Sequence, residues 1–178
     1  MIRLLWSIGL VLGLLAGLAG PSLSAPLGLT KVGIGAYGGA NIPIVQDDAE
    51  SGGLFGIRGR VGLLSLLMFE PSVNFLKNSD ADVEGITFEA PKVTSYAFNL
   101  ILKGGPTYAT GGVGVTKLEV PGGTGETNET TYNFGGGIEL GFGPVAVDVS
   151  PRLFVIETAD SASRKNLAVM AGVNYYFF

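Results

Sequence analysis

Hydrophobic and polar residues alternate with a period of two in eight segments of the chain, each about ten residues long. This alternation places apolar side chains on one face of an extended strand and polar side chains on the other. We predict strands at 30–42, 53–63, 67–77, 93–103, 107–118, 131–142, 145–157 and 165–177. In the last segment, one face is unbroken and apolar and consists of Leu167, Val169, Ala171, Val173, Tyr175 and Phe177.

The connections between these segments alternate in length. Short links lie at 64–66, 104–106 and 143–144, whereas longer polar links run over 43–52, 78–91, 119–130 and 158–164. Tight turns at one end and longer loops at the other describe an up-and-down meander. With an even number of strands, both ends of the chain then lie on the short-turn side.

Segments of this length suit strands that cross a membrane at a tilt. The polar faces carry few charges and many glycines, which would make a poor soluble exterior. Aromatic residues near the strand ends resemble two interfacial girdles: Tyr108, Phe142, Tyr175 and Phe177 on the turn side, and Phe55, Phe75, Tyr132 and Phe134 on the loop side. We therefore predict an all-β fold, an eight-stranded antiparallel up-and-down transmembrane β-barrel. A narrow porin-like channel and a soluble lipocalin-like barrel that binds lipid in the periplasm are the alternatives.

Composition restricts the chemistry of the chain. It has 29 glycines among 178 residues, no histidine, no cysteine and a net charge of −4. Without histidine or cysteine there is no Ser-His-Asp triad, thiolate nucleophile, disulfide or common transition-metal ligand. Without a basic surplus there is no footprint for nucleic acid. We expect no enzyme, no catalytic residue, no metal and no cofactor.

Two short motifs imitate ligand sites. Residues 33–38 match G-x-G-x-x-G, but no helical pattern follows them and Arg58 stands near the expected acid, so a first barrel strand explains them better. Residues 80–85 resemble the start of a calcium loop, but Pro91 occupies the position of the bidentate glutamate.

The N-terminus resembles a secretory signal. Arg3 precedes an apolar core from Leu4 to Ala19, and Gly20-Pro21 ends it before small residues. We predict a signal peptide over 1–24, cleaved near Ser24, and a barrel domain over 25–178. An uncleaved N-terminal anchor is the alternative.

Several short motifs carry a family resemblance: Phe69-Glu70-Pro71, residues 106–114, residues 134–139 and the closing Asn174-Tyr175-Tyr176-Phe177-Phe178. In these motifs the chain resembles the small bacterial outer-membrane β-barrel domain family, relatives of OmpA and OmpX. The resemblance implies insertion by the outer-membrane assembly machinery, which recognises a last strand ending in an aromatic residue. Tyr175, Tyr176, Phe177 and Phe178 are thus the candidate assembly signal. The apolar face here ends on Phe177, whereas the family usually keeps the terminal phenylalanine in register with that face. Recognition therefore uses Phe177 or is less efficient.

The polar faces predict a charged lumen. A turn centred on Ser65 would set Arg60 opposite Glu70, and a turn at Gly143-Pro144 would set Glu139 opposite Asp148. Two carboxylates enclosed together must either share a proton or be neutralised by cations. We predict a network that fills the lumen, in which three arginines neutralise three acids: Arg58, Arg60 and Arg152 with Glu70, Glu139 and Asp148. The expected partners are outer-membrane lipids and lipopolysaccharide together with the assembly machinery, around a monomer whose termini are both periplasmic.

Overall fold

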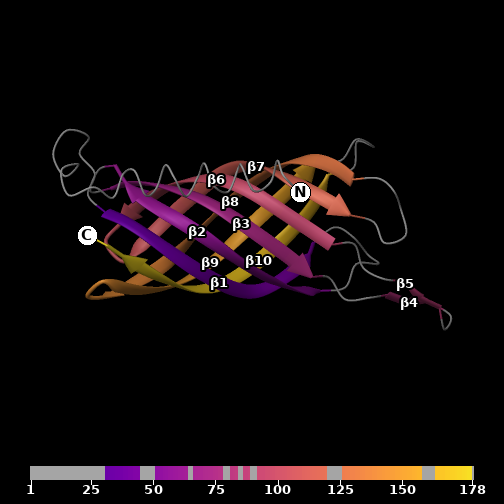
Figure 1. Cartoon of the computed structure of the whole chain (residues 1–178), viewed down its shortest axis with the longest axis horizontal. Helices are drawn as coiled ribbons and strands as arrows, with labels where there is room; N and C mark the ends of the chain where they lie inside the picture. Colours follow the sequence, from indigo (N-terminus) through magenta and orange to yellow (C-terminus); the bar gives the residue numbers. More distant parts are fainter. Residues whose placement is uncertain are drawn as a thin grey trace.

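Eight long strands close into a barrel, and a short hairpin extends beyond the barrel at the end opposite the C-terminus (Figure 1). This computed structural model describes residues 31–44, 51–63, 66–77, 81–83, 86–88, 92–119, 126–157 and 163–177. The predicted signal peptide, Ser65 and Phe178 lie outside the described residues. In the described residues, no helix is long and apolar enough to cross a membrane.

The barrel strands are β1 (Lys31–Pro43), β2 (Gly52–Gly62), β3 (Leu67–Lys77), β6 (Lys92–Gly104), β7 (Thr107–Glu119), β8 (Glu126–Phe142), β9 (Val145–Glu157) and β10 (Arg164–Tyr176). The short hairpin consists of β4 (Ala81–Val83) and β5 (Ile86–Phe88). Seven of the eight predicted strands agree with these bounds to within one residue at either end. The eighth, β8, begins at Glu126 rather than at 131, because Glu126–Thr130 pair with Val115–Glu119 of β7. The hairpin β4–β5 lies in a segment that the sequence indicated only as a long loop.

Every strand pairs antiparallel with its neighbour in sequence order around the ring, and β10 closes the barrel against β1. One row of paired residues passes through Val32, Val61, Phe69, Leu100, Gly111, Phe134, Leu153, Leu167 and Ile42. The row leaves β1 at Val32 and returns to it at Ile42, so the barrel has a shear of ten residues. A barrel of eight strands has an interior just wide enough for side chains to fill.

Glycine followed by proline forms two of the tight turns. Gly105 (φ 68°) and Gly143 (φ 66°) adopt positive φ angles that other residues rarely tolerate, and each precedes a proline with its fixed negative φ. This combination suits the type II′ turns that join twisted antiparallel strands. At the third turn, Arg58 pairs with Ser72 and Val61 with Phe69, which is the register of a turn centred on residue 65.

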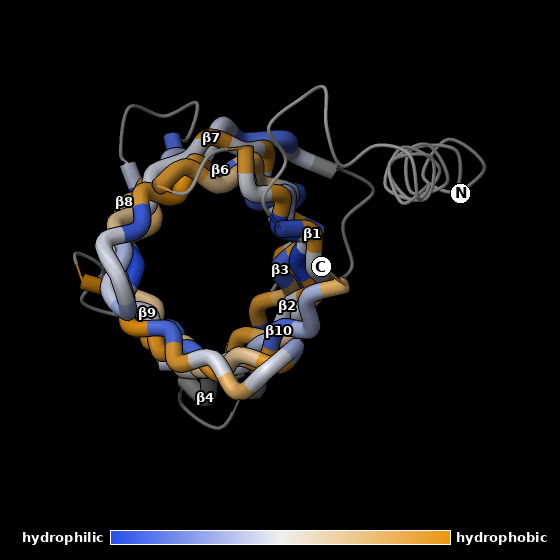
Figure 2. The backbone as a smooth tube through the Cα atoms, turned by 90° about the vertical axis from the view of Figure 1, so that its left-hand side faces the viewer, coloured by the Kyte–Doolittle hydropathy of each residue, from blue (hydrophilic) through white to orange (hydrophobic). Residues whose placement is uncertain are grey.

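The outward face of the barrel is apolar, and the lumen is largely polar. On β8, Tyr132, Phe134, Ile138, Leu140 and Phe142 are exposed, whereas the intervening Asn133 and Glu139 are buried. Viewed along its axis, the chain forms a closed ring (Figure 2). A soluble lipocalin-like barrel has the reverse arrangement, so the structure does not support that alternative.

The prediction that Tyr108 belongs to the aromatic girdle is wrong. Its side chain is 6% exposed and points into the lumen. The two-residue turn at Gly105-Pro106 pairs Tyr108 with Lys103, and both share the inward face with Asn99 and Ile101. The other seven residues named for the girdles are exposed.

Candidate functional site

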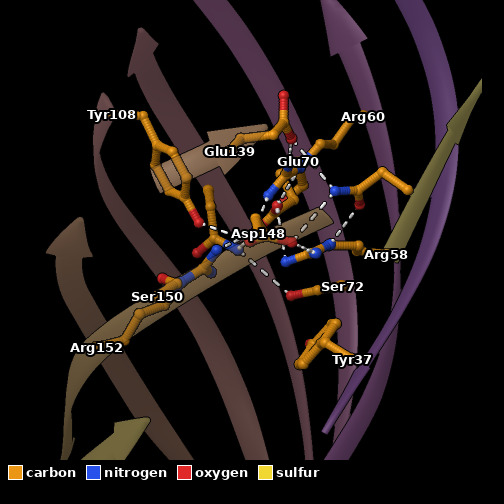
Figure 3. A network of polar contacts seen from close by, with 12 residues as sticks. Tyr37, Arg58, Arg60, Glu70, Ser72, Tyr108, Glu139, Asp148, Ser150 and Arg152 are labelled. Atoms are coloured by element: carbon orange, nitrogen blue, oxygen red, sulfur yellow. Dashed lines mark hydrogen bonds and ion pairs between the residues drawn. The ribbon is translucent and has the colours of Figure 1, made fainter. Parts of the chain in front are cut away.

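The candidate site is a cluster of charged side chains inside the barrel (Figure 3). Because side chains alternate along a strand, each member points inward between two outward-facing neighbours. The structure brings together all six residues that the sequence singled out, and each of them is buried: Arg58 and Arg60 on β2, Glu70 on β3, Glu139 on β8, and Asp148 and Arg152 on β9.

Glu70 lies at the centre of the cluster and is fully buried, with an exposed fraction of 0%. Arg60 Nε donates to Glu70 Oε2 over 2.7 Å, between neighbouring strands. Arg152 reaches across the lumen from β9 and places Nη2 2.8 Å from Glu70 Oε1. Arg58 Nη1 lies 3.9 Å from Oε2, and Asn99 Nδ2 donates to Oε1 over 3.3 Å. The carboxylate of Glu70 is therefore shared by three guanidinium groups.

Glu139 and Asp148 face each other across β8 and β9, as the turn at Gly143-Pro144 requires. Like charges directly opposite are destabilising unless cations neutralise them. Glu139 forms ion pairs with Arg60 and Lys103, and Asp148 forms ion pairs with Arg58 and, at 3.6 Å, with Arg60. Asn174 Nδ2 lies between the two acids and is 3.2 Å from both Glu139 Oε2 and Asp148 Oδ1.

The cluster includes three polar residues that the sequence did not place in the lumen. The side chain of Lys103 is 18% exposed and adds a fourth cation to the three arginines. The hydroxyl of Tyr108 donates to Asp148 Oδ2 over 2.8 Å, and that of Tyr176 donates to Glu139 Oε2 over 3.0 Å. The alternation of side chains along a strand could have placed two of them in the lumen. Lys103 lies on the same face as the buried Asn99, and Tyr176 lies on the same face as the buried Asn174.

Apolar side chains cover the charged cluster on both sides along the barrel axis. Towards the turns there is a buried cluster of Met68, Ile101, Tyr108, Ala146 and Tyr176. Towards the loops there is a second one of Tyr37, Leu54, Phe154, Ala168 and Met170. Aromatic rings also face the guanidinium groups, since Arg58 Cζ lies 4.8 Å from the centroid of the Tyr37 ring. Each of the three acids in the cluster thus forms an ion pair with at least one arginine. Among the described residues, no group of three or more His, Cys, Asp or Glu could hold a metal ion.

The candidate assembly signal is divided between the two faces of β10. Tyr175 and Phe177 point outward and form an edge-to-face pair with ring centroids 5.5 Å apart. Tyr176 points into the lumen, where its hydroxyl contacts Glu139. The apolar outward face of the last strand therefore continues to Phe177.

Comparison with known proteins identifies the fold. No family model matches the sequence, and no curated protein matches it. Among solved structures, Neisserial surface protein A is similar at 16% identity, with a TM-score of 0.66 over 84% of this chain and 99% of that chain. The chain has the fold of the small eight-stranded outer-membrane β-barrels.

Two further solved structures share this barrel. The N-terminal β-barrel domain of Pseudomonas aeruginosa OprF matches at 15% identity, with a TM-score of 0.56 over 83% of this chain and 97% of that chain. The Yersinia pestis outer membrane protein Ail in a phospholipid bilayer nanodisc matches at 13% identity, with a TM-score of 0.52 over 83% of this chain and 100% of that chain. At such low identity the likeness concerns the fold, so function has to be argued from the residues of this chain.

Proposed function

We propose that this chain is an integral protein of the bacterial outer membrane with a structural or surface-interaction role, and that its charged cluster closes the lumen. One observation carries the proposal: the fully buried Glu70 is contacted by arginines from both sides of the lumen, Arg60 at 2.7 Å and Arg152 at 2.8 Å. Side chains that bridge the lumen in this way leave little room for a continuous column of water.

The proposed orientation places both ends of the chain in the periplasm and the longer connections outside the cell. In support, β1 begins and β10 ends at the turn end of the barrel, where Gly33 pairs with Tyr176. Outer-membrane barrels carry short periplasmic turns and longer extracellular loops. Surface recognition would then belong to the loops, with outer-membrane lipids, lipopolysaccharide and the assembly machinery as partners of a monomeric barrel.

The proposal includes no enzymatic activity. Glu70, Glu139 and Asp148 each form ion pairs with lysine or arginine and lie beneath apolar side chains. A catalytic acid or base must reach its substrate, and the ion pairs and apolar side chains around these three acids leave no path for one.

Membrane insertion is tested by fractionation and by electrophoresis. The mature chain should sediment with the outer membrane, and folded protein should migrate differently in unheated and boiled detergent samples. Recovery from the periplasm without detergent would reject the membrane assignment.

Closure of the lumen is tested in planar bilayers, with a porin of known conductance as the positive control in the same membrane. We expect the purified monomer to insert without steady conductance in the nanosiemens range. A steady conductance would instead support the narrow-channel alternative, and the charged cluster would then line a pore.

A further inference from the structure

Outward-facing charges lie at only one end of the barrel. Among the described side chains, those that are charged and face outward all lie towards the longer loops: Lys77, Lys92, Lys117, Glu119, Glu157 and Lys165. At the turn end, Lys31 and Lys103 belong to the inward face instead, where Lys31 lies over the ring of Tyr176. The loop end therefore meets a polar, charged environment at the level where the apolar band stops.

Two of these lysines face each other directly. Lys77 ends β3, Lys92 begins β6, and the two residues pair in register. Both side chains are exposed and point outward, because their neighbours Leu76 and Val93 point into the lumen. Like charges directly opposite each other are destabilising, so this pair favours a bound anion. On its other side, Lys92 pairs with Glu119 of β7, whereas Lys77 pairs on its other side with Gly53 of β2.

Aromatic rings lie on the outward face of β2, β3 and β6, with Phe55 and Phe75 next to Lys77 at the loop end and Phe69 near the turn end. The Phe55 and Phe75 rings stack with centroids 5.0 Å apart, and the Phe69 and Phe98 rings stack at 5.8 Å. Lys77 follows Phe75 by two residues and shares its face. Phosphate affinity above and apolar surface below are the two features that a charged lipid requires.

The opposite wall of the barrel differs in both respects. In the ring of eight strands, β10 lies four strands away from β6. The outward faces of β1 and β10 carry alanine and aliphatic residues such as Ala36, Ile42 and Val169, and their aromatic pair, Tyr175 and Phe177, lies at the turn end. A single exposed lysine, Lys165, faces outward at the loop end of β10. This wall therefore provides a control lysine without aromatic rings beside it.

We propose that the β3–β6 wall binds a phosphorylated glycolipid of the lipid A class, with its phosphate groups held by Lys77 and Lys92 and its acyl chains along Phe55 and Phe75. The inference rests on the proposed function, because the loop end must face the outer leaflet. It adds a binding site on the barrel wall to the lipopolysaccharide partner that the proposed function names.

The experiment measures lipid A binding to the full folded barrel in a neutral detergent by native mass spectrometry. Each lysine near a charged membrane surface accounts for about five-fold in binding, so Lys77→Gln with Lys92→Gln should weaken binding roughly 25-fold. Lys165→Gln should leave the affinity unchanged, and Lys77→Arg with Lys92→Arg should retain binding. Removal of the phosphates from lipid A should weaken binding to the wild-type barrel to a similar degree.

Each opposing result overturns the inference. Equal affinity of the double glutamine variant and the wild type would show that the lysine pair is not the site. Equal binding of phosphatidylglycerol would show a general attraction to anionic lipid rather than a glycolipid site. Insertion into pure phosphatidylcholine, read by the heat-dependent gel shift, tests the membrane assignment separately. If insertion succeeds but binding does not depend on the lysines, only this inference fails.

Discussion

Glu70 and Arg152 form the ion pair that most directly tests whether charges meet across the lumen. They belong to β3 and β9, which are not neighbours in the barrel, and their side chains approach to 2.8 Å. Replacement of Glu70 by glutamine keeps the shape and removes the charge. Replacement of Arg152 by methionine keeps most of the volume and removes the guanidinium. The free energy of unfolding of both single variants and of the double variant then gives the coupling between the two groups.

The magnitude follows from burial and from the number of partners. Two unit charges about 4 Å apart attract by about 4 kcal/mol at an effective dielectric constant of 20. Loss of one partner of a buried pair costs about 3–5 kcal/mol, because the other charge stays buried. Glu70→Gln should lie near the upper value, since it leaves Arg58, Arg60 and Arg152 with only Glu139 and Asp148. Arg152→Met should lie near the lower value, because two arginines still contact Glu70.

The assay is reversible unfolding in urea from phosphatidylcholine vesicles, followed by circular dichroism. The double variant should be more stable than the sum of the single losses predicts, by about 2–4 kcal/mol. Arg164→Met, at an exposed position on β10, provides the control and should be additive with Glu70→Gln. Additivity of Glu70→Gln and Arg152→Met within about 0.5 kcal/mol would refute the contact across the lumen.

Other predictions concern the remaining contacts of the barrel. The double variant Arg60→Ala with Glu70→Ala should lose less free energy of unfolding in urea than the two single variants lose together. Additive losses would show that the two side chains do not interact. Val169→Arg should cost about 2–4 kcal/mol or block assembly in the same assay, because this exposed side chain lies on the apolar outward face that we propose contacts lipid. Gly114→Ala should destabilise by about 1–3 kcal/mol, since its Cβ would lie 2.1 Å from the carbonyl oxygen of Tyr96, whereas Gly141→Ala meets nothing within 4 Å. Phe177→Ala should slow assembly in outer-membrane extracts, and an unchanged rate would remove Phe177 from the assembly signal.

Local pattern accounts for much of the agreement between sequence and structure. A strand that crosses an apolar layer must alternate, so its length and faces are visible in the sequence. The start of β8 was not visible, because Glu126–Thr130 are polar and their pairing with β7 depends on backbone hydrogen bonds. The side of Tyr108 was misassigned because a ring near a strand end fits either a girdle or a lumen. Because Tyr108 pairs with Lys103, the two side chains share the inward face. This pairing depends on the exact length of the turn at Gly105-Pro106.

The contacts that span a single turn follow directly from the sequence. Once the turns at residue 65 and at Gly143-Pro144 are placed, Arg60 must face Glu70 and Glu139 must face Asp148, since pairing runs outward residue by residue. The contacts across the lumen become visible only in the closed barrel, and they are Arg152 with Glu70, Arg58 with Asp148 and Arg60 with Glu139. Their partners depend on the relative heights of strands that are not neighbours. Those heights follow from the tilt and the ten-residue shear that closure of eight strands imposes, and no periodicity within a single strand carries that information.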